Sequence, residues 1–167
     1  MMVESAKNLS KVDHAAIRVN QAFIIGLAVL AFILDIPWLA AVTGGVMLLG
    51  TLLKKPGFSF IYRLVLKPLG LVKPDVVDDN PEPHRFAQGF GSVVLLGGAV
   101  ALFGGLPVLG WVLVWLVAAL ASLNLFGGFC VGCAMYYWLS RLDVPGFDKV
   151  PPPNTVPGMR PKAGEVK

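Results

Sequence analysis

The chain has 167 residues, 56% of them hydrophobic and 14% charged, and a formal net charge of +4. A soluble domain carries about a quarter charged residues, so this composition excludes an ordinary soluble domain and predicts one compact integral membrane domain. The positive charge requires no nucleic acid partner, because basic residues beside membrane spans meet anionic lipid headgroups.

Four apolar runs follow a polar N-terminal segment, residues 1–17, and predict transmembrane helices. Prolines and glycines separate the runs. A mixed apolar and basic stretch after the second and the fourth run predicts a short interfacial amphipathic helix. The sequence therefore predicts an all-α integral membrane protein, with four transmembrane helices as two hairpins, each followed by an interfacial helix. The membrane domain covers residues 18–142, with spans at about 19–36, 38–53, 86–106 and 107–125 and interfacial helices at about 57–69 and 129–142.

Two further polar stretches have no apolar run. The linker at residues 71–85 contains an acidic cluster that we interpret as a solvated loop: Asp75, Asp78, Asp79 and Glu82. Residues 143–167 form a Pro-rich cytoplasmic tail, which is predicted to be disordered or extended. The first apolar run is too long for the core of a cleaved signal peptide, and a second span follows at once, so we interpret it as a retained helix.

The two hairpins share sequence features in the same order. The first begins with RVNQAF at residues 18–23, and the second begins with RFAQGF at residues 85–90. Each hairpin turns at a proline and ends in Gly-Phe, at Gly57-Phe58 and Gly128-Phe129. We interpret the chain as an internal repeat of two units, an arrangement used by other membrane proteins.

Basic residues predict the orientation. All fourteen Lys and Arg residues lie at or before Arg18, between Lys54 and Arg85, or from Arg141 onward, and the turns near 35–38 and 104–109 have none. The positive-inside rule then places both termini and the linker in the cytoplasm. We expect a multi-pass protein of the cell inner (plasma) membrane, with its cysteines near the cytoplasmic face, where a permanent structural disulfide is not expected.

Cys130 and Cys133 are the only cysteines, and their C-x-x-C spacing predicts a reactive thiol pair. Gly127-Gly128 should end the fourth span and place Cys130 in the first turn of the next helix. Free N–H groups and the helix dipole stabilise a thiolate there. Cys130 is the expected nucleophile and Cys133 the resolving thiol, and we expect Val131-Gly132 to keep access open. The alternative, without a reaction, is that both cysteines fill space as small apolar residues.

Other polar residues have two readings each. Arg18 and Arg85 occupy matching repeat positions, so they are expected either to face a shared centre and stabilise a thiolate or bound anion, or to snorkel to lipid phosphates. Four amides form a polar network or join helices by hydrogen bonds: Asn20, Gln21, Gln88 and Asn124. A zinc site built from His14, His84, Cys130 and Cys133 is conceivable, but the histidines lack local metal-ligand spacing. We predict no metal and no cofactor.

Three motifs together resemble a known family. They are an early D-x-x-x-x-R-x-N-Q beginning at Asp13, a central P-x-R-F-A-Q beginning at Pro83, and a late G-F-C-x-G-C at Gly128 to Cys133. Over roughly residues 11–142 the chain resembles a bacterial membrane family catalogued as domain of unknown function 4395. The resemblance implies a four-span membrane protein with a retained dithiol and an association with thioredoxin-like and rhodanese-like proteins. It implies no established activity.

The leading hypothesis is a membrane thiol–disulfide redox or sulfur-relay protein with a thioredoxin-like or rhodanese-like cytoplasmic partner. With one cysteine pair only, electron transfer across the membrane is not expected. The second hypothesis is a non-catalytic accessory subunit of a larger membrane complex. Glycines on the span faces would then allow close approach of helices: Gly44-Gly45, Gly97-Gly98 and Gly104-Gly105. A small-solute carrier would need more intramembrane charge than the chain has.

Overall fold

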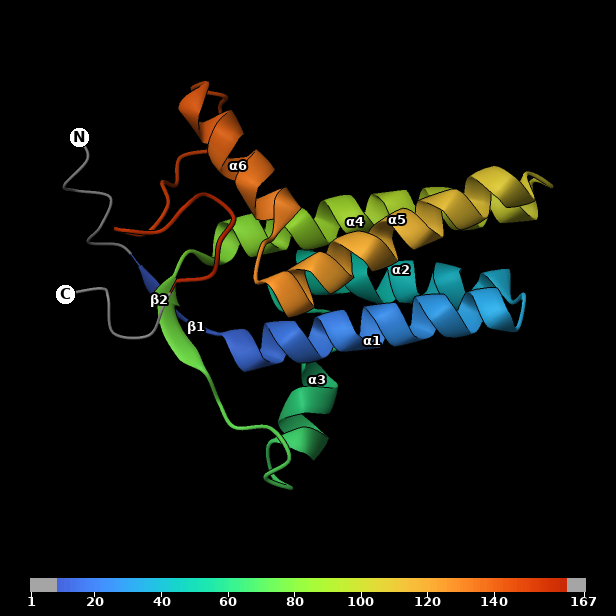
Figure 1. Cartoon of the computed structure of the whole chain (residues 1–167), viewed down its shortest axis with the longest axis horizontal. Helices are drawn as coiled ribbons and strands as arrows, with labels where there is room; N and C mark the ends of the chain where they lie inside the picture. The colour runs from blue at the N-terminus through green and yellow to red at the C-terminus, as the bar shows by residue number, and fades with distance from the viewer. Residues whose placement is uncertain (1–8, 162–167) are drawn as a thin grey trace.

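The computed structural model describes residues 9–161, and four long helices run side by side in it (Figure 1). The element order is β1 (Ser10–Asp13), α1 (His14–Ile33), α2 (Pro37–Leu52), α3 (Ser59–Ile61), η2 (Tyr62–Leu66), β2 (Val76–Asp79), α4 (Pro81–Phe103), α5 (Pro107–Gly127) and α6 (Val131–Arg141). The two short turns, α1–α2 and α4–α5, lie at one end of the bundle. The strands and the start of α6 lie at the other end, as Figure 1 shows.

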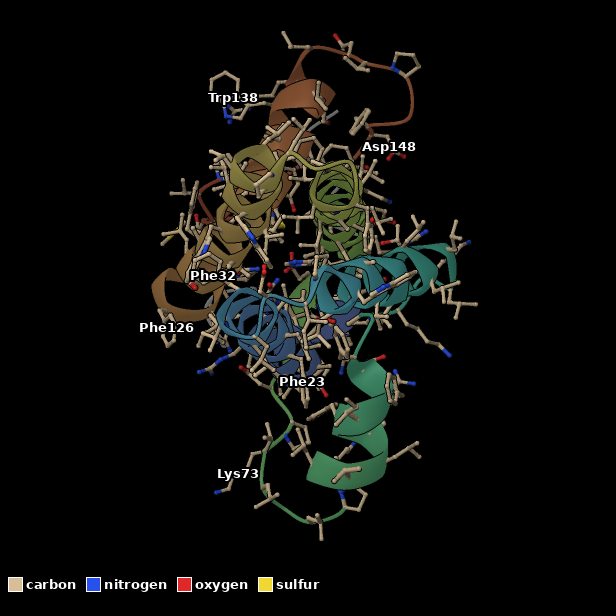
Figure 2. All side chains as sticks on the ribbon, turned by 90° about the vertical axis from the view of Figure 1, so that its right-hand side faces the viewer. Phe23, Phe32, Lys73, Phe126, Trp138 and Asp148 are labelled. Carbon is tan, nitrogen blue, oxygen red and sulfur yellow. A yellow bond between two sulfur atoms is a disulfide. The ribbon has the colours of Figure 1, made fainter. Side chains whose placement is uncertain are left out.

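Three helices, α1, α4 and α5, are long and apolar enough to cross a membrane. Helix α2 is apolar but has 16 residues, which cover about 24 Å at 1.5 Å per residue, less than the roughly 30 Å of a bilayer core. The structure is therefore consistent with a membrane protein, and the fourth span stays a prediction. Large apolar side chains face outward, as Figure 2 shows for Phe126 and Trp138, which are 83% and 61% exposed.

Helices α1 and α4 begin earlier than predicted because local capping extends them into the polar flanks. Asp13 precedes α1 and accepts a hydrogen bond from the backbone N–H of Ala15, which satisfies a free donor at the helix start. Helix α4 starts with Pro81, whose fixed φ suits the first turn. Both helices therefore begin five residues before the expected spans.

Small residues set the helix spacing inside the bundle. A Cβ atom on Gly98 of α4 would lie 3.0 Å from the carbonyl oxygen of Gly110 on α5, and one on Gly44 would lie 2.9 Å from Leu96. These glycines therefore permit close packing within the chain. A Cβ on Gly45 or Gly97 would meet nothing within 4 Å, so these two face open space.

The prediction of an all-α chain missed two short strands, β1 and β2, which pair antiparallel. In the register, Lys11 lies opposite Asp78. These two residues are 67 positions apart (78 − 11), the same separation as Arg18 and Arg85 (85 − 18). Each half of the chain therefore has the order strand, two helices and a short helical segment, as the interpretation as a repeat requires.

Candidate functional site

The cysteine pair lies at the start of α6, as its sequence predicts. Helix α5 ends at Gly127, and Gly128 has a φ of +64°, a left-handed conformation that glycine adopts at low cost. Cys130 is the N-cap of α6, and its Sγ accepts a hydrogen bond from the backbone N–H of Cys133 over 3.2 Å. The two cysteines are joined as a disulfide, with Cα atoms 5.2 Å apart. Both are buried.

Close packing of α6 on α4 brings a histidine to the pair. A Cβ atom on Gly132 would lie 2.6 Å from the Cβ of Ala87, so only glycine allows this approach. It places Nδ1 of His84 3.4 Å from Sγ of Cys133. Gly132 therefore positions the histidine. Val131 and Gly132 also line a cavity that reaches Cys130, and the expectation that they keep access open stays a prediction.

A buried carboxylate fixes that histidine. Nε2 of His84 lies 2.8 Å from Oδ2 of Asp79, and Nε2 of His14 lies 3.1 Å from the same oxygen. A carboxylate only accepts hydrogen bonds, so both Nε2 atoms donate. A neutral His84 then points an unprotonated Nδ1 at Cys133. The four side chains form a continuous row from Cys133 to His84, Asp79 and His14.

Asp79 is 3% exposed, so the interpretation of the whole acidic cluster as a solvated loop was wrong at this position. Burial by itself raises the pKa of the Asp79 carboxyl. Hydrogen bonds from His14 and His84, the charge of His84 and the N–H of Asn80 outweigh burial and hold this pKa well below its ordinary value. Asp79 therefore carries a negative charge at neutral pH.

The corner between β2 and α4 is also bonded to α6 and the tail. The side-chain amide of Asn80 donates to the hydroxyl of Tyr137 over 3.3 Å and to the carbonyl of Val150 over 2.8 Å. Burial raises the pKa of Tyr137 to about 12, so its hydroxyl stays protonated. This corner holds Asp79 and Cys133 in a fixed relation.

The disulfide adjoins two cavities. A polar cavity of about 290 Å³ is lined by both cysteines together with Arg18, His84 and Arg160. A second cavity of about 210 Å³ lies among α1, α4 and α5, has mainly apolar walls, and reaches Cys130 but not Cys133. Cys130 therefore lies between a polar space at the end of the bundle and an apolar space inside it.

The two predicted arginines do not converge on one centre in the structure. Arg18 lines the polar cavity with both cysteines. Arg85 lines the apolar cavity and a third one, and its Nε atom is buried without a hydrogen-bond partner among the described residues. Arg160, which the sequence did not single out, is the second cation beside the cysteines.

The four predicted amides separate into two pairs. Asn20 accepts from the backbone N–H of Phe58 over 2.9 Å, and Gln88 accepts from that of Gly57 over 3.2 Å. These two hold the connection between α2 and α3. Gln21 and Asn124 line both cavities beside Cys130. The amides therefore do not form one network in the structure.

The structure brings together three of the four residues of the conceivable zinc set. Ligand atoms of His84, Cys130 and Cys133 lie within 4.8 Å of one another. His14 instead bonds Asp79, the carboxylate that orients His84. A reduced pair with His84 offers two thiolates and an imidazole, a donor set that suits zinc with one position free. A carboxylate behind the histidine is typical of such sites.

The sequence did not predict that Asp79, Tyr137 and the C-terminal segment would contribute to the site. One signal was present for Asp79, because it ends a short polar segment directly before a Pro-initiated helix that carries His84. No local pattern indicated that Gly158 and Arg160 would reach the cysteines. Gly158 accepts a hydrogen bond from the N–H of Cys130 over 2.7 Å.

Comparisons with known proteins identify the family but no relative of known activity. No curated protein matches the chain, and no solved structure matches it. The family described as "Domain of unknown function (DUF4395)" matches residues 12–141, which include the second half of β1, all of β2, the helices of the described residues and the cysteine pair. The chain belongs to this family.

Proposed function

We propose that the protein is a membrane thiol–disulfide redox protein whose Cys130–Cys133 pair exchanges electrons with a cytoplasmic thioredoxin-like partner. One observation carries the proposal: Nδ1 of His84 lies 3.4 Å from Sγ of Cys133, while buried Asp79 holds the other ring nitrogen. A cysteine that only fills space requires no histidine oriented by a carboxylate. A general base within reach of a thiol is what the resolving step of disulfide exchange needs.

In the proposed cycle Cys130 is the nucleophile and Cys133 the resolving thiol. The Cys130 thiolate, stabilised at the start of α6, attacks a disulfide of the partner and forms a mixed disulfide, and one partner sulfur leaves as a thiolate. Nδ1 of His84 then takes the proton of Cys133, and the Cys133 thiolate attacks Sγ of Cys130. The second partner sulfur leaves, so the partner gains two electrons and the Cys130–Cys133 disulfide forms. The reverse sequence reduces this disulfide.

A sulfur relay uses the same residues. With a rhodanese-like partner that carries a cysteine persulfide, the Cys130 thiolate would attack the outer sulfur and become a persulfide, and the partner's cysteine would leave as a thiolate. Attack of Cys133 on Sγ of Cys130 would then release hydrosulfide and form the disulfide. Arg18 in the polar cavity would stabilise the thiolate or a bound anion such as thiosulfate.

The proposed topology has four spans, α1, α2, α4 and α5, as two hairpins in the cell inner membrane with cytoplasmic termini. The distribution of Lys and Arg supports it, because the α1–α2 and α4–α5 turns contain none. These turns lie at the end of the bundle opposite the start of α6 (Figure 1), where Cys130 is the N-cap. The proposed cytoplasmic face is therefore the face of the cysteine pair.

Alkylation rates of the reduced protein test the function and the orientation together. In Cys133→Ser, Cys130 should react with a membrane-impermeant maleimide below about pH 7, in opened vesicles but not in intact cells. The same variant should accumulate a mixed disulfide with thioredoxin, and Cys130→Ser should not. An ordinary thiol pKa for Cys130 and no mixed disulfide in either variant would exclude the redox function.

A non-catalytic accessory subunit of a larger membrane complex is the second candidate. Gly45 on α2 and Gly97 on α4 favour it, because a Cβ atom on either would meet nothing within 4 Å. Such bare helix faces suit close packing against another membrane protein. An accessory subunit should copurify with its complex at a fixed ratio and keep its role in a Cys130→Ser, Cys133→Ser double variant. The proposed redox protein should lose its role in that variant.

A further inference from the structure

The C-terminal segment returns to the cysteine pair and forms backbone hydrogen bonds there. The N–H of Cys130 donates to the carbonyl of Gly158 over 2.7 Å, and the N–H of Arg160 donates to the carbonyl of Gly128 over 3.1 Å. Between these bonds, Phe129 and Met159 form an antiparallel bridge. Residues 158–160 therefore pair with residues 128–130 as a short added strand, directly beside the expected nucleophile. Figure 1 shows this part of the tail in red near β2.

The two paired segments approach each other closely at Gly158. Gly158 has a φ of +85°, and a Cβ atom on it would lie 2.8 Å from the carbonyl oxygen of Cys130 and 2.8 Å from the Cβ of Ala134. Any side chain at this position would push the tail away from Cys130. The tail therefore occupies the space through which another extended chain would approach the disulfide.

The contacts that hold this segment are exchangeable. Arg160 forms an ion pair with Asp75, and both side chains are partly exposed. Ion pairs of this kind add little stability. Burial and the nearby charge of Arg18 lower the pKa of Arg160, so a like charge opposes its position. Upstream, the tail is held separately, by packing of Phe147 against Phe86 and Tyr136 with ring centroids 5.3 and 4.9 Å apart. Residues 158–160 can therefore leave while the upstream contacts remain.

We propose that residues 128–130 are a backbone-pairing site for an extended, cysteine-bearing segment of the redox partner, and that residues 158–160 fill this site in its absence. The inference rests on the proposed function, since it names how the partner docks. Backbone pairing does not depend on side chains, so a partner segment can replace the tail by adding the same strand. It would lie beside Cys130 with its reactive sulfur within reach of attack.

One substitution in the tail tests the inference, and the same tail offers a matched control. Gly158→Ala should expel residues 158–160. Gly146→Ala introduces a side chain at a similar positive φ, +96°, where it meets nothing within 4 Å. The full chain in nanodiscs is reduced by thioredoxin or by a small phosphine, and both rates are measured. Gly158→Ala should raise the rate of reduction by thioredoxin about tenfold. This is the increase expected if residues 158–160 occupy the site at residues 128–130 about nine-tenths of the time and the substitution removes them from it. Gly146→Ala should leave it unchanged.

A peptide of residues 154–161 added to Gly158→Ala should slow thioredoxin again, and the same peptide carrying Ala at position 158 should not. An equal rise in the phosphine rate would overturn the inference, because the tail would then only shield the disulfide. An unchanged thioredoxin rate in Gly158→Ala would overturn it as well. If thioredoxin reduces neither the wild type nor any variant while the phosphine reduces them all, the proposed function fails first and the inference falls with it.

Discussion

The two halves of the chain place different chemistry at matching positions. Cys133 follows Gly128 by five residues, and Tyr62 follows Gly57 by five residues. In the first half the hydroxyl of Tyr62 donates directly to Asp13 over 2.9 Å. In the second half a histidine lies between the sulfur of Cys133 and the carboxylate of Asp79. Both arrangements tie a short helical segment to a carboxylate, which is the N-cap of α1 in the first half and the last residue of β2 in the second.

The comparison shows how one scaffold supports two roles. Burial, together with the nearby Asp13, raises the pKa of Tyr62 to about 12, so its hydroxyl remains a donor that links two elements. Thiols and imidazoles exchange protons near neutral pH, so the row in the second half is suited to proton transfer. The first half is therefore expected to be structural, and the second half to carry the reaction.

The largest expected effect is in the second half. Cys130→Ser should abolish thiol–disulfide exchange with thioredoxin, because the nucleophile is lost. Closing so short a loop contributes about 2 kcal/mol to the free energy of unfolding, so the variant should still fold. Exchange rates and a thermal unfolding curve check this, with Ser122→Ala on α5 as a control. Residual exchange in Cys130→Ser would assign the attack to Cys133.

His84→Gln should slow the resolving step about a hundredfold, the usual contribution of a general base, and leave the first attack unchanged. A slow resolving step should increase the amount of mixed disulfide that acid quenching traps. His14→Gln also removes a hydrogen bond to Asp79. Because His84, and not His14, is the histidine bonded to the sulfur of Cys133, His14→Gln should slow the resolving step less. Equal effects of the two substitutions would show that the histidines only stabilise the fold.

Asp79→Asn should slow exchange about tenfold, as the loss of an orienting carboxylate behind a histidine usually does. It should also remove a dependence of stability on pH. The native pKa of Asp79 is lowered, so its contribution is present above the unfolded value of about 4 and is lost as pH falls below it. Denaturant titrations from pH 7 to pH 3 should show a loss of stability that is larger in the wild type than in Asp79→Asn. Equal losses of stability in the wild type and in Asp79→Asn would contradict the assignment of this pH dependence to Asp79.

The smallest effect is expected in the first half. Tyr62→Phe removes one hydrogen bond to Asp13 and should lower the free energy of unfolding by about 1 kcal/mol. Thioredoxin exchange should be unchanged, because this hydroxyl does not contact the cysteines. Chemical unfolding and exchange assays on one preparation check both statements. A slower exchange in Tyr62→Phe would show that the two halves are coupled.

Much of the site's local structure was predictable from the sequence. Gly127-Gly128 indicated the end of one helix and, directly after it, the start of the next. The structure confirms both and makes Cys130 the N-cap of α6. The pairing of His84 with Cys133 was not predictable in this way. These residues are 49 positions apart, and the sequence suggested for the histidine only a metal ligand beside His14 or a polar residue of the interfacial zone.

The sequence by itself determined the apolar helices, their breaks and the position of the cysteines at a helix start, because each depends on residues a few positions apart. Only the tertiary structure decided that Asp79 is buried between two histidines and that Gly132 brings α6 onto α4. It also decided that the carbonyl of Gly158 accepts a hydrogen bond from the N–H of Cys130. Each of these contacts joins segments distant in the chain. They form because the strands pair, because small residues let the helices approach closely, and because buried polar groups must find partners.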